Sequence, residues 1–82
     1  MDIIYSKHAL EQMALRHIPK DVVDAVLLNP DKVETQNGKK IFQSVIDFMG
    51  EGYYLIRIFV NTIDTPNIVI TVYRTSKFDK YQ

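Results

Sequence analysis

Apolar and polar positions repeat with one period before Pro30 and with another after it. Before Pro30 the apolar residues recur at helical spacing, which predicts helices. Ser6 is a suitable N-cap, so a first helix is expected from there to about Arg16. The apolar stripe expected for this helix consists of Leu10, Met13 and Ala14.

A second helix is predicted between Pro19 and Asn29. Proline suits the start of a helix because its missing N–H would have no partner there. Asp21 in the first turn interacts favourably with the helix dipole. Asn29 precedes Pro30, and a residue before proline avoids helical angles, so the helix should end there. Its expected buried stripe is Val22, Val23, Val26 and Leu27.

Beyond Pro30 the apolar residues alternate with polar ones, as in β-strands. Residues 32–36, KVETQ, are a short strand candidate, and the following Asn37-Gly38 is a hairpin turn signal. Longer strands are expected at residues 40–48, 53–60 and 67–75.

The alternation assigns the strand side chains to two faces of a sheet. The apolar face is expected to carry Phe42, Ile46, Phe48, Tyr54, Ile56, Ile58, Val60, Ile68, Ile70 and Val72. The second face is expected to carry Gln43, Asp47, Tyr53, Leu55, Arg57, Phe59, Thr71 and Tyr73. This mixture of polar and large apolar groups is compatible with a binding surface and with an ordinary solvated face.

The order of elements predicts an α+β fold in a single domain over residues 1–82. Two N-terminal helices should pack on one face of a three- or four-stranded antiparallel sheet. Residues 2–6, DIIYS, read either as a short first strand or as an extended arm.

The composition of the chain excludes several classes of function. The formal net charge of the 82 residues is zero, which counts against nucleic-acid binding by bulk attraction. The chain has no cysteine, so disulfides, thiolate catalysis and cysteine zinc sites are excluded. It has no long apolar run and no signal-like start, so we expect no membrane span and a cytoplasmic location. No metal-ligand or phosphate-loop motif occurs, and we expect no metal and no cofactor.

Hydroxyls and cations gather near the C-terminal end. The cations of this cluster are Arg74, Lys77 and Lys80, and its hydroxyl donors are Thr75 and Ser76. Two aromatic rings, those of Tyr73 and Tyr81, could stack on bases. The cluster could bind a phosphate or an acidic partner, and it could equally be a solvated strand end.

Three further residues could take part in chemistry. His8 lies in the first turn of the first helix, where the dipole favours a neutral imidazole that can accept a proton, although local packing would also explain it. Arg16 could contact a ligand or form a surface ion pair. Arg57 lies in the middle of an apolar strand and must reach solvent, a ligand or a carboxylate, for which Asp47 is the expected partner.

Three stretches together resemble a family of small bacterial and phage domains of unknown function. They are SKHALEQMALRHIPKDVVDAVLLNPDKV at residues 6–33, LIRIFV at residues 55–60 and IVITVYRTSKFDKY at residues 68–81. The family in turn is similar to the RelE- and BrnT-like ribonuclease toxins. One departure is Gln12, where the family often has arginine.

The resemblance implies a metal-independent ribonuclease of the toxin–antitoxin kind, in which a ribose 2′-hydroxyl attacks the adjacent phosphate. Catalytic roles would fall to His8, as base or acid, and to Arg16, Arg74 and Lys77. RNA contacts would come from Arg57, Tyr73, Thr75, Ser76, Lys80 and Tyr81. The expected partners are RNA and a cognate antitoxin protein.

A non-catalytic protein-binding or dimerising module of the same fold is the alternative, with a second copy of the chain as a possible partner. The ribonuclease hypothesis predicts that His8 lies close to the cluster at residues 73–77. The module hypothesis predicts an exposed apolar patch around Leu55 and Phe59.

Overall fold

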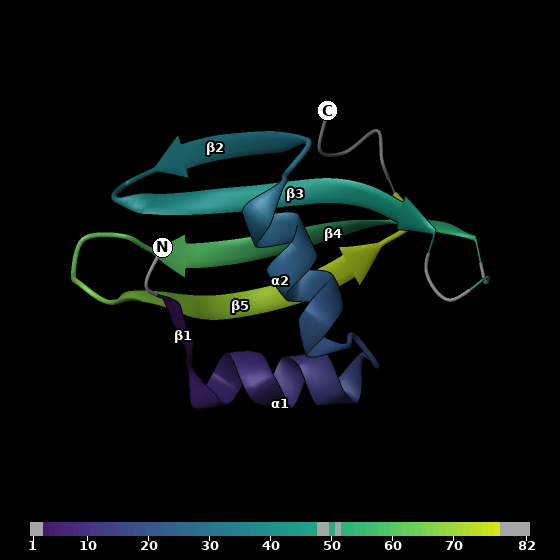
Figure 1. Ribbon diagram of the computed structural model, residues 1–82, viewed down its shortest axis with the longest axis horizontal. Coiled ribbons are helices and arrows are strands. Elements are labelled where there is room, and N and C mark those ends of the chain that lie inside the picture. The colour runs from purple at the N-terminus through teal and green to yellow at the C-terminus, as the bar shows by residue number, and fades with distance from the viewer. Residues whose placement is uncertain (1–2, 48–49, 51, 78–82) are drawn as a thin grey trace.

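The computed structural model describes residues 3–47, 50 and 52–77 (Figure 1). The elements in this part of the chain are β1 (Ile3–Tyr5), α1 (Lys7–Leu15), α2 (Lys20–Leu28), β2 (Lys32–Gln36), β3 (Lys39–Asp47), β4 (Tyr53–Asn61) and β5 (Asn67–Thr75). Both helices and all the strands expected after Pro30 are present, and β2 and β5 have the predicted bounds.

The strands form one five-stranded mixed sheet in the order β1-β5-β4-β3-β2. Strands β2 to β5 are antiparallel neighbours, whereas β1 runs parallel to β5. The expectation of a three- or four-stranded antiparallel sheet is therefore wrong. Hairpin signals reveal only pairings between consecutive strands, and β1 pairs with a strand from the far end of the described chain, for which no local signal exists.

The two helices lie on the same face of the sheet (Figure 1). Helix α1 packs against β5, and α2 crosses β3 and β4. The core between the layers includes Val23 and Val26 from α2 and Ile56 and Ile58 from β4. Within the described residues, no helix has the length and apolar character that crossing a membrane requires.

Helix α1 begins as predicted but buries a different stripe. The Ser6 side chain accepts a hydrogen bond from the backbone N–H of Ala9 at 3.0 Å, so it is the N-cap. Ala9 and Met13, four residues apart, are buried, whereas Leu10 and Ala14 are exposed. The predicted stripe is correct only for Met13, because a helix that rests on one strand buries a narrow face.

Helix α2 follows the prediction more closely. Pro19 is its N-cap residue and Asp21 lies in its first turn. Val23, Val26 and Leu27 are buried, and Val22 is partly buried against the same core.

A β-bulge changes the face assignment in β5. Phe59 pairs with Thr71, but the next residue of β4, Val60, pairs with Val69. Ile70 is therefore an extra residue, and Val69 rather than Ile68 or Ile70 is fully buried in the core. The prediction that Ile68 and Ile70 face inward with Val72 is wrong for the first two. Phe48 lies outside the described residues.

Candidate functional site

An open cavity of about 460 Å³ lies where the end of α1 meets the end of β5. We call it the Arg16–Lys77 cavity. Its wall is formed by Leu15, Arg16, His17, Tyr54, Arg74, Thr75, Ser76 and Lys77. The end of α1 and the end of β5, which lie far apart in the sequence, thus contribute cations to one site.

The turn after α1 fixes the helix side of the cavity. His17 has a φ of 54°, a left-handed conformation that histidine adopts more readily than most residues. The N–H of Ile18 donates to the carbonyl of Met13 at 2.8 Å, and the N–H of His17 donates to that of Ala14 at 3.2 Å. These bonds end the helix in the manner of a Schellman motif and place the side chains of Arg16 and His17 at its end.

Arg16 is partly buried at this helix end. Its Nη1 atom and the Oε1 atom of Gln12, one turn earlier, are buried and have no hydrogen-bond partner among the described residues. Buried polar atoms without partners are costly, and in native proteins they often mark a place where water or a ligand binds. Arg16 also forms part of the cavity wall, so its guanidinium is a suitable donor to an anion there.

The strand side of the cavity is held by contacts around Arg74. Its guanidinium carbon lies 4.7 Å from the ring centroid of Tyr54 on β4, which is a cation–π contact. After the strand, the backbone N–H of Lys77 donates to the Thr75 hydroxyl at 3.0 Å, which orders the turn. Lys77 itself is exposed, so its ammonium group can reach a bound molecule.

The cavity wall is cationic although the whole chain is neutral. Arg16, Arg74 and Lys77 are three cations, and the described residues of the wall include no carboxylate. The hydroxyls of Thr75 and Ser76 add neutral donors. A concave surface with cations and hydroxyls and without carboxylates favours an anion.

The structure brings together five of the residues predicted for the site, namely Arg16, Arg74, Thr75, Ser76 and Lys77. His8 does not line the cavity. It is exposed in the first turn of α1, and the eight residues from His8 to Arg16 span about 12 Å along the helix. His17 lines the cavity instead, and its position directly after Arg16 is the signal by which the sequence could have indicated it.

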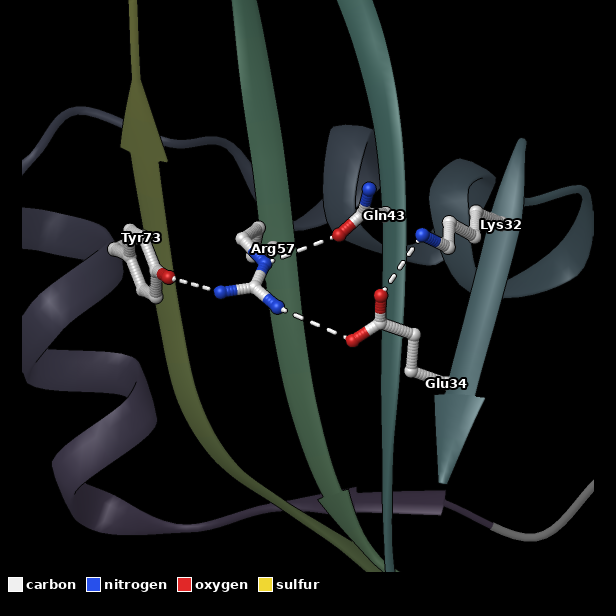
Figure 2. Close-up of polar contacts among 5 residues, drawn as sticks. All are labelled: Lys32, Glu34, Gln43, Arg57 and Tyr73. Atoms are coloured by element: carbon white, nitrogen blue, oxygen red, sulfur yellow. Dashed lines mark hydrogen bonds and ion pairs between the residues drawn. The ribbon is translucent and has the colours of Figure 1, made fainter. Parts of the chain in front are cut away.

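Arg57 and Tyr73 belong to a second polar cluster, on the sheet face opposite the helices (Figure 2). Arg57 donates from Nε to Gln43 Oε1 at 3.1 Å and from Nη1 to the Tyr73 hydroxyl at 2.7 Å. Its Nη2 lies 3.8 Å from Glu34 Oε2, and Lys32 Nζ lies 2.9 Å from Glu34 Oε1. The ion pair and hydrogen bond with Lys32, with a smaller contribution from Arg57, lower the pKa of Glu34.

Aromatic rings enclose the Arg57 side chain, which is only 7% exposed. The rings of Phe59 and Tyr73 stack at 6.0 Å, and the guanidinium lies 5.4 Å and 5.9 Å from their centroids. The expected pairing of Arg57 with Asp47 is wrong, because Asp47 lies opposite Tyr53, at the end of β3. The carboxylate that Arg57 uses comes from β2.

The remaining predicted residues have mixed outcomes. Leu55 is buried on this second face rather than exposed, and Phe59 is half-buried. Lys80 and Tyr81 lie outside the described residues. Within residues 3–47, 50 and 52–77, no group of three or more His, Cys, Asp or Glu side chains is placed to hold a metal ion.

A third polar cluster joins β1 to α2. The Tyr5 hydroxyl donates a hydrogen bond to Asp24, and Lys20 Nζ lies 3.0 Å from the same carboxylate and 4.9 Å from the Tyr5 ring centroid. Burial and the neighbouring Asp24 raise the pKa of Tyr5, and the hydrogen bond from Tyr5 lowers the pKa of Asp24. These contacts attach the short edge strand to the helix layer.

Comparison with protein families finds one whose description is "Domain of unknown function (DUF4258)", and its match covers residues 5–74. The matched segment includes both helices and all but the ends of the sheet. Comparisons with curated proteins and with solved structures gave no match.

Proposed function

This chain belongs to the DUF4258 family of domains of unknown function, and we propose that it binds RNA through a phosphate held in the Arg16–Lys77 cavity. The observation that supports this proposal is the grouping of three cations, the hydroxyls of Thr75 and Ser76 and one imidazole around one open cavity whose described wall residues include no carboxylate. Guanidinium groups make strong, geometrically selective contacts with phosphate oxygens. A net charge of zero does not oppose such a site, because the charge that matters is local.

We further propose that the bound RNA is cleaved without a metal, as the likeness to RelE and BrnT toxins suggests. A base takes the proton of the ribose 2′-hydroxyl, and the 2′-oxygen forms a bond to the adjacent phosphorus. The bond from phosphorus to the 5′-oxygen breaks, and an acid protonates that oxygen. The products are a 2′,3′-cyclic phosphate and a free 5′-hydroxyl, so no oxidant or other reactant is needed.

The cavity offers residues for each of these roles. Arg16, Arg74 and Lys77 would stabilise the extra negative charge of the five-coordinate phosphorus intermediate. His17 would carry the proton, since its imidazole belongs to the wall. His8, the histidine predicted from the sequence, would need an RNA chain that extends along α1 to take part.

Cleavage of a labelled RNA in the presence of EDTA tests this proposal. Arg74→Ala should lower the rate by about 10²–10³-fold, the usual effect of removing one group that stabilises transition-state charge. His17→Ala should lower the rate as well, and an RNA with a 2′-deoxyribose at the cleavage position should bind without being cut. Lys40→Ala, which removes an exposed lysine of β3 that is not part of the cavity wall, is the matched control.

Equal rates for the wild type, Arg74→Ala and His17→Ala would identify a contaminating nuclease and overturn the proposal of catalysis. His8→Ala tests the prediction made from the sequence, because its loss of activity with retention in His17→Ala would reassign the proton transfer. Binding of the 2′-deoxy RNA, measured by fluorescence anisotropy, separates an anion site from a catalytic one.

The second candidate function is a non-catalytic protein-binding or dimerising module. The observation that favours it is the exposure of Leu28, at 88%, at the end of α2. An antitoxin-like partner with acidic residues could also cover the Arg16–Lys77 cavity, and competition between such a partner and RNA would then be expected.

A further inference from the structure

Strand β2 forms one edge of the sheet and has only β3 as a strand neighbour among the described residues (Figure 1). Its five residues pair with β3 in one continuous register from Lys32 to Gln36, without a bulge. Every second residue of an edge strand directs its backbone N–H and C=O away from the sheet, where another strand can pair with them. The edge is therefore open to strand addition.

Natural edge strands are usually protected by a proline, a bulge or a charged residue that blocks pairing. Within β2 the candidates for such protection are Lys32 and Glu34, since the strand has no proline and no bulge. Between them lies Val33, which is 44% exposed. Two opposite charges that flank an apolar residue are complementary to the same sequence running in the antiparallel direction.

We propose that β2 pairs antiparallel with β2 of a second copy of this chain, with Val33 at the two-fold axis. In this register Val33 faces Val33, and Lys32 of each copy faces Glu34 of the other. Lys32 and Glu34 project from the same face of the sheet (Figure 2), so the two intermolecular ion pairs form on one side and the two valines meet on the other.

Charge selects this register over its neighbours. A two-fold axis at Glu34 would place two carboxylates opposite each other, which is unfavourable. An axis at Thr35 would leave Lys32 and Glu34 opposite uncharged residues of the turn and strand end. Of these three positions for the two-fold axis, only Val33 places both Lys32 and Glu34 opposite a residue of the opposite charge. The proposal stands independently of the proposed RNA site, which lies at the ends of α1 and β5.

A single-cysteine cross-link tests the register, because the chain has no cysteine of its own. Directly opposite residues in an antiparallel pair have Cα atoms about 4.5–5.5 Å apart, within the range that a disulfide spans. Val33→Cys should therefore give a disulfide-linked dimer under mild oxidation. Thr35→Cys is the matched control on the same face of the strand, and in this register its two copies lie too far apart to join.

Sedimentation velocity of the wild type and of charge variants tests the association itself. The wild type should show a dimer that Lys32→Glu dissociates, because residue 32 would then face Glu34 of the other copy. The double variant Lys32→Glu with Glu34→Lys should restore the dimer, and circular dichroism of each variant confirms that it is folded. A wild type that stays monomeric, a dimer unaffected by Lys32→Glu, or cross-linking of Thr35→Cys in place of Val33→Cys would each overturn the proposal. A sedimenting species that contains one copy of this chain and a different protein, and that Lys32→Glu dissociates, would assign the edge to another occupant and overturn it as well.

Discussion

Replacing Arg57 with methionine should destabilise the fold by about 1–3 kcal/mol, the usual cost of leaving a buried polar group without its partner. Arg57 gives hydrogen bonds of 3.1 Å and 2.7 Å to Gln43 and Tyr73. Methionine removes both, and Gln43, whose side chain belongs to the buried set, loses its donor. The Tyr73 hydroxyl is less buried and can turn toward water, so most of the cost arises at Gln43.

The size of this effect makes it measurable. An 82-residue domain has a total stability of roughly 4–12 kcal/mol. With an m-value of about 1 kcal/mol per molar urea, the unfolding midpoint of Arg57→Met should fall by about 1 M or more. The assay is urea unfolding followed by circular dichroism, with Lys40→Met as the control that removes an exposed cation from the neighbouring strand.

A second variant tests whether the cost arises from Gln43. If both Arg57 and Gln43 become methionine, the buried Gln43 acceptor is removed together with its donor, and the double variant should be more stable than the sum of the two single changes predicts. An Arg57→Met midpoint within about 0.3 M of the wild type, or strict additivity in the double variant, would refute the reasoning.

Two further predictions concern the turns and the edge strand β1. Gly38→Ala and Gly50→Ala should each cost about 1–2 kcal/mol in urea unfolding, because both residues have left-handed φ angles that a side chain disfavours. The new Cβ at Gly38 would lie 2.7 Å from the end of the Ile63 side chain, but Ile63 is 71% exposed and its side chain can move away, so a cost at Gly38 well above that at Gly50 would contradict this reasoning. Because the folded state raises the pKa of Tyr5, its contribution to stability should be complete below the ordinary tyrosine pKa and should be lost as the pH rises toward the raised value. The melting temperature of Tyr5→Phe should therefore fall less than that of the wild type from about pH 8 to about pH 11, and parallel curves would argue against a native-state pKa shift at Tyr5.

The elements of the fold could be predicted from the sequence because their signals are local. Ser6 caps α1, and Asn37-Gly38 forms the β2–β3 turn with both φ angles positive, as its composition indicates. The parallel pairing of β1 with β5 and the bulge at Ile70 have no such signal. Both depend on how segments distant in sequence pack together, and the spacing of apolar residues within one segment does not reveal this.

The candidate site could be predicted in part for a related reason. Arg74 and Lys77 are close in sequence, so the sequence itself predicts that they lie together. The position of Arg16 beside them depends on how α1 packs on β5, which the sequence does not reveal. The prediction of His8 rests on the helix dipole and on the family resemblance, neither of which fixes a distance, and the length of α1 places His8 at the other end of the helix from the cavity. The expectation that Arg57 contacts a carboxylate is correct, but identifying that carboxylate as Glu34 on β2 requires the strand register, which the sequence does not provide.

The pairing of β1 with β5 affects the order in which the protein can fold during its synthesis. On the ribosome β1 and α1 emerge first, but the strand that both of them contact, β5, is synthesised after every other described element. The hairpins of β2, β3 and β4 join neighbouring segments and can form earlier. A nascent chain that has not yet released β5 must therefore hold β1 and α1 without the strand that both of them contact, and such long-range closure slows the completion of the fold.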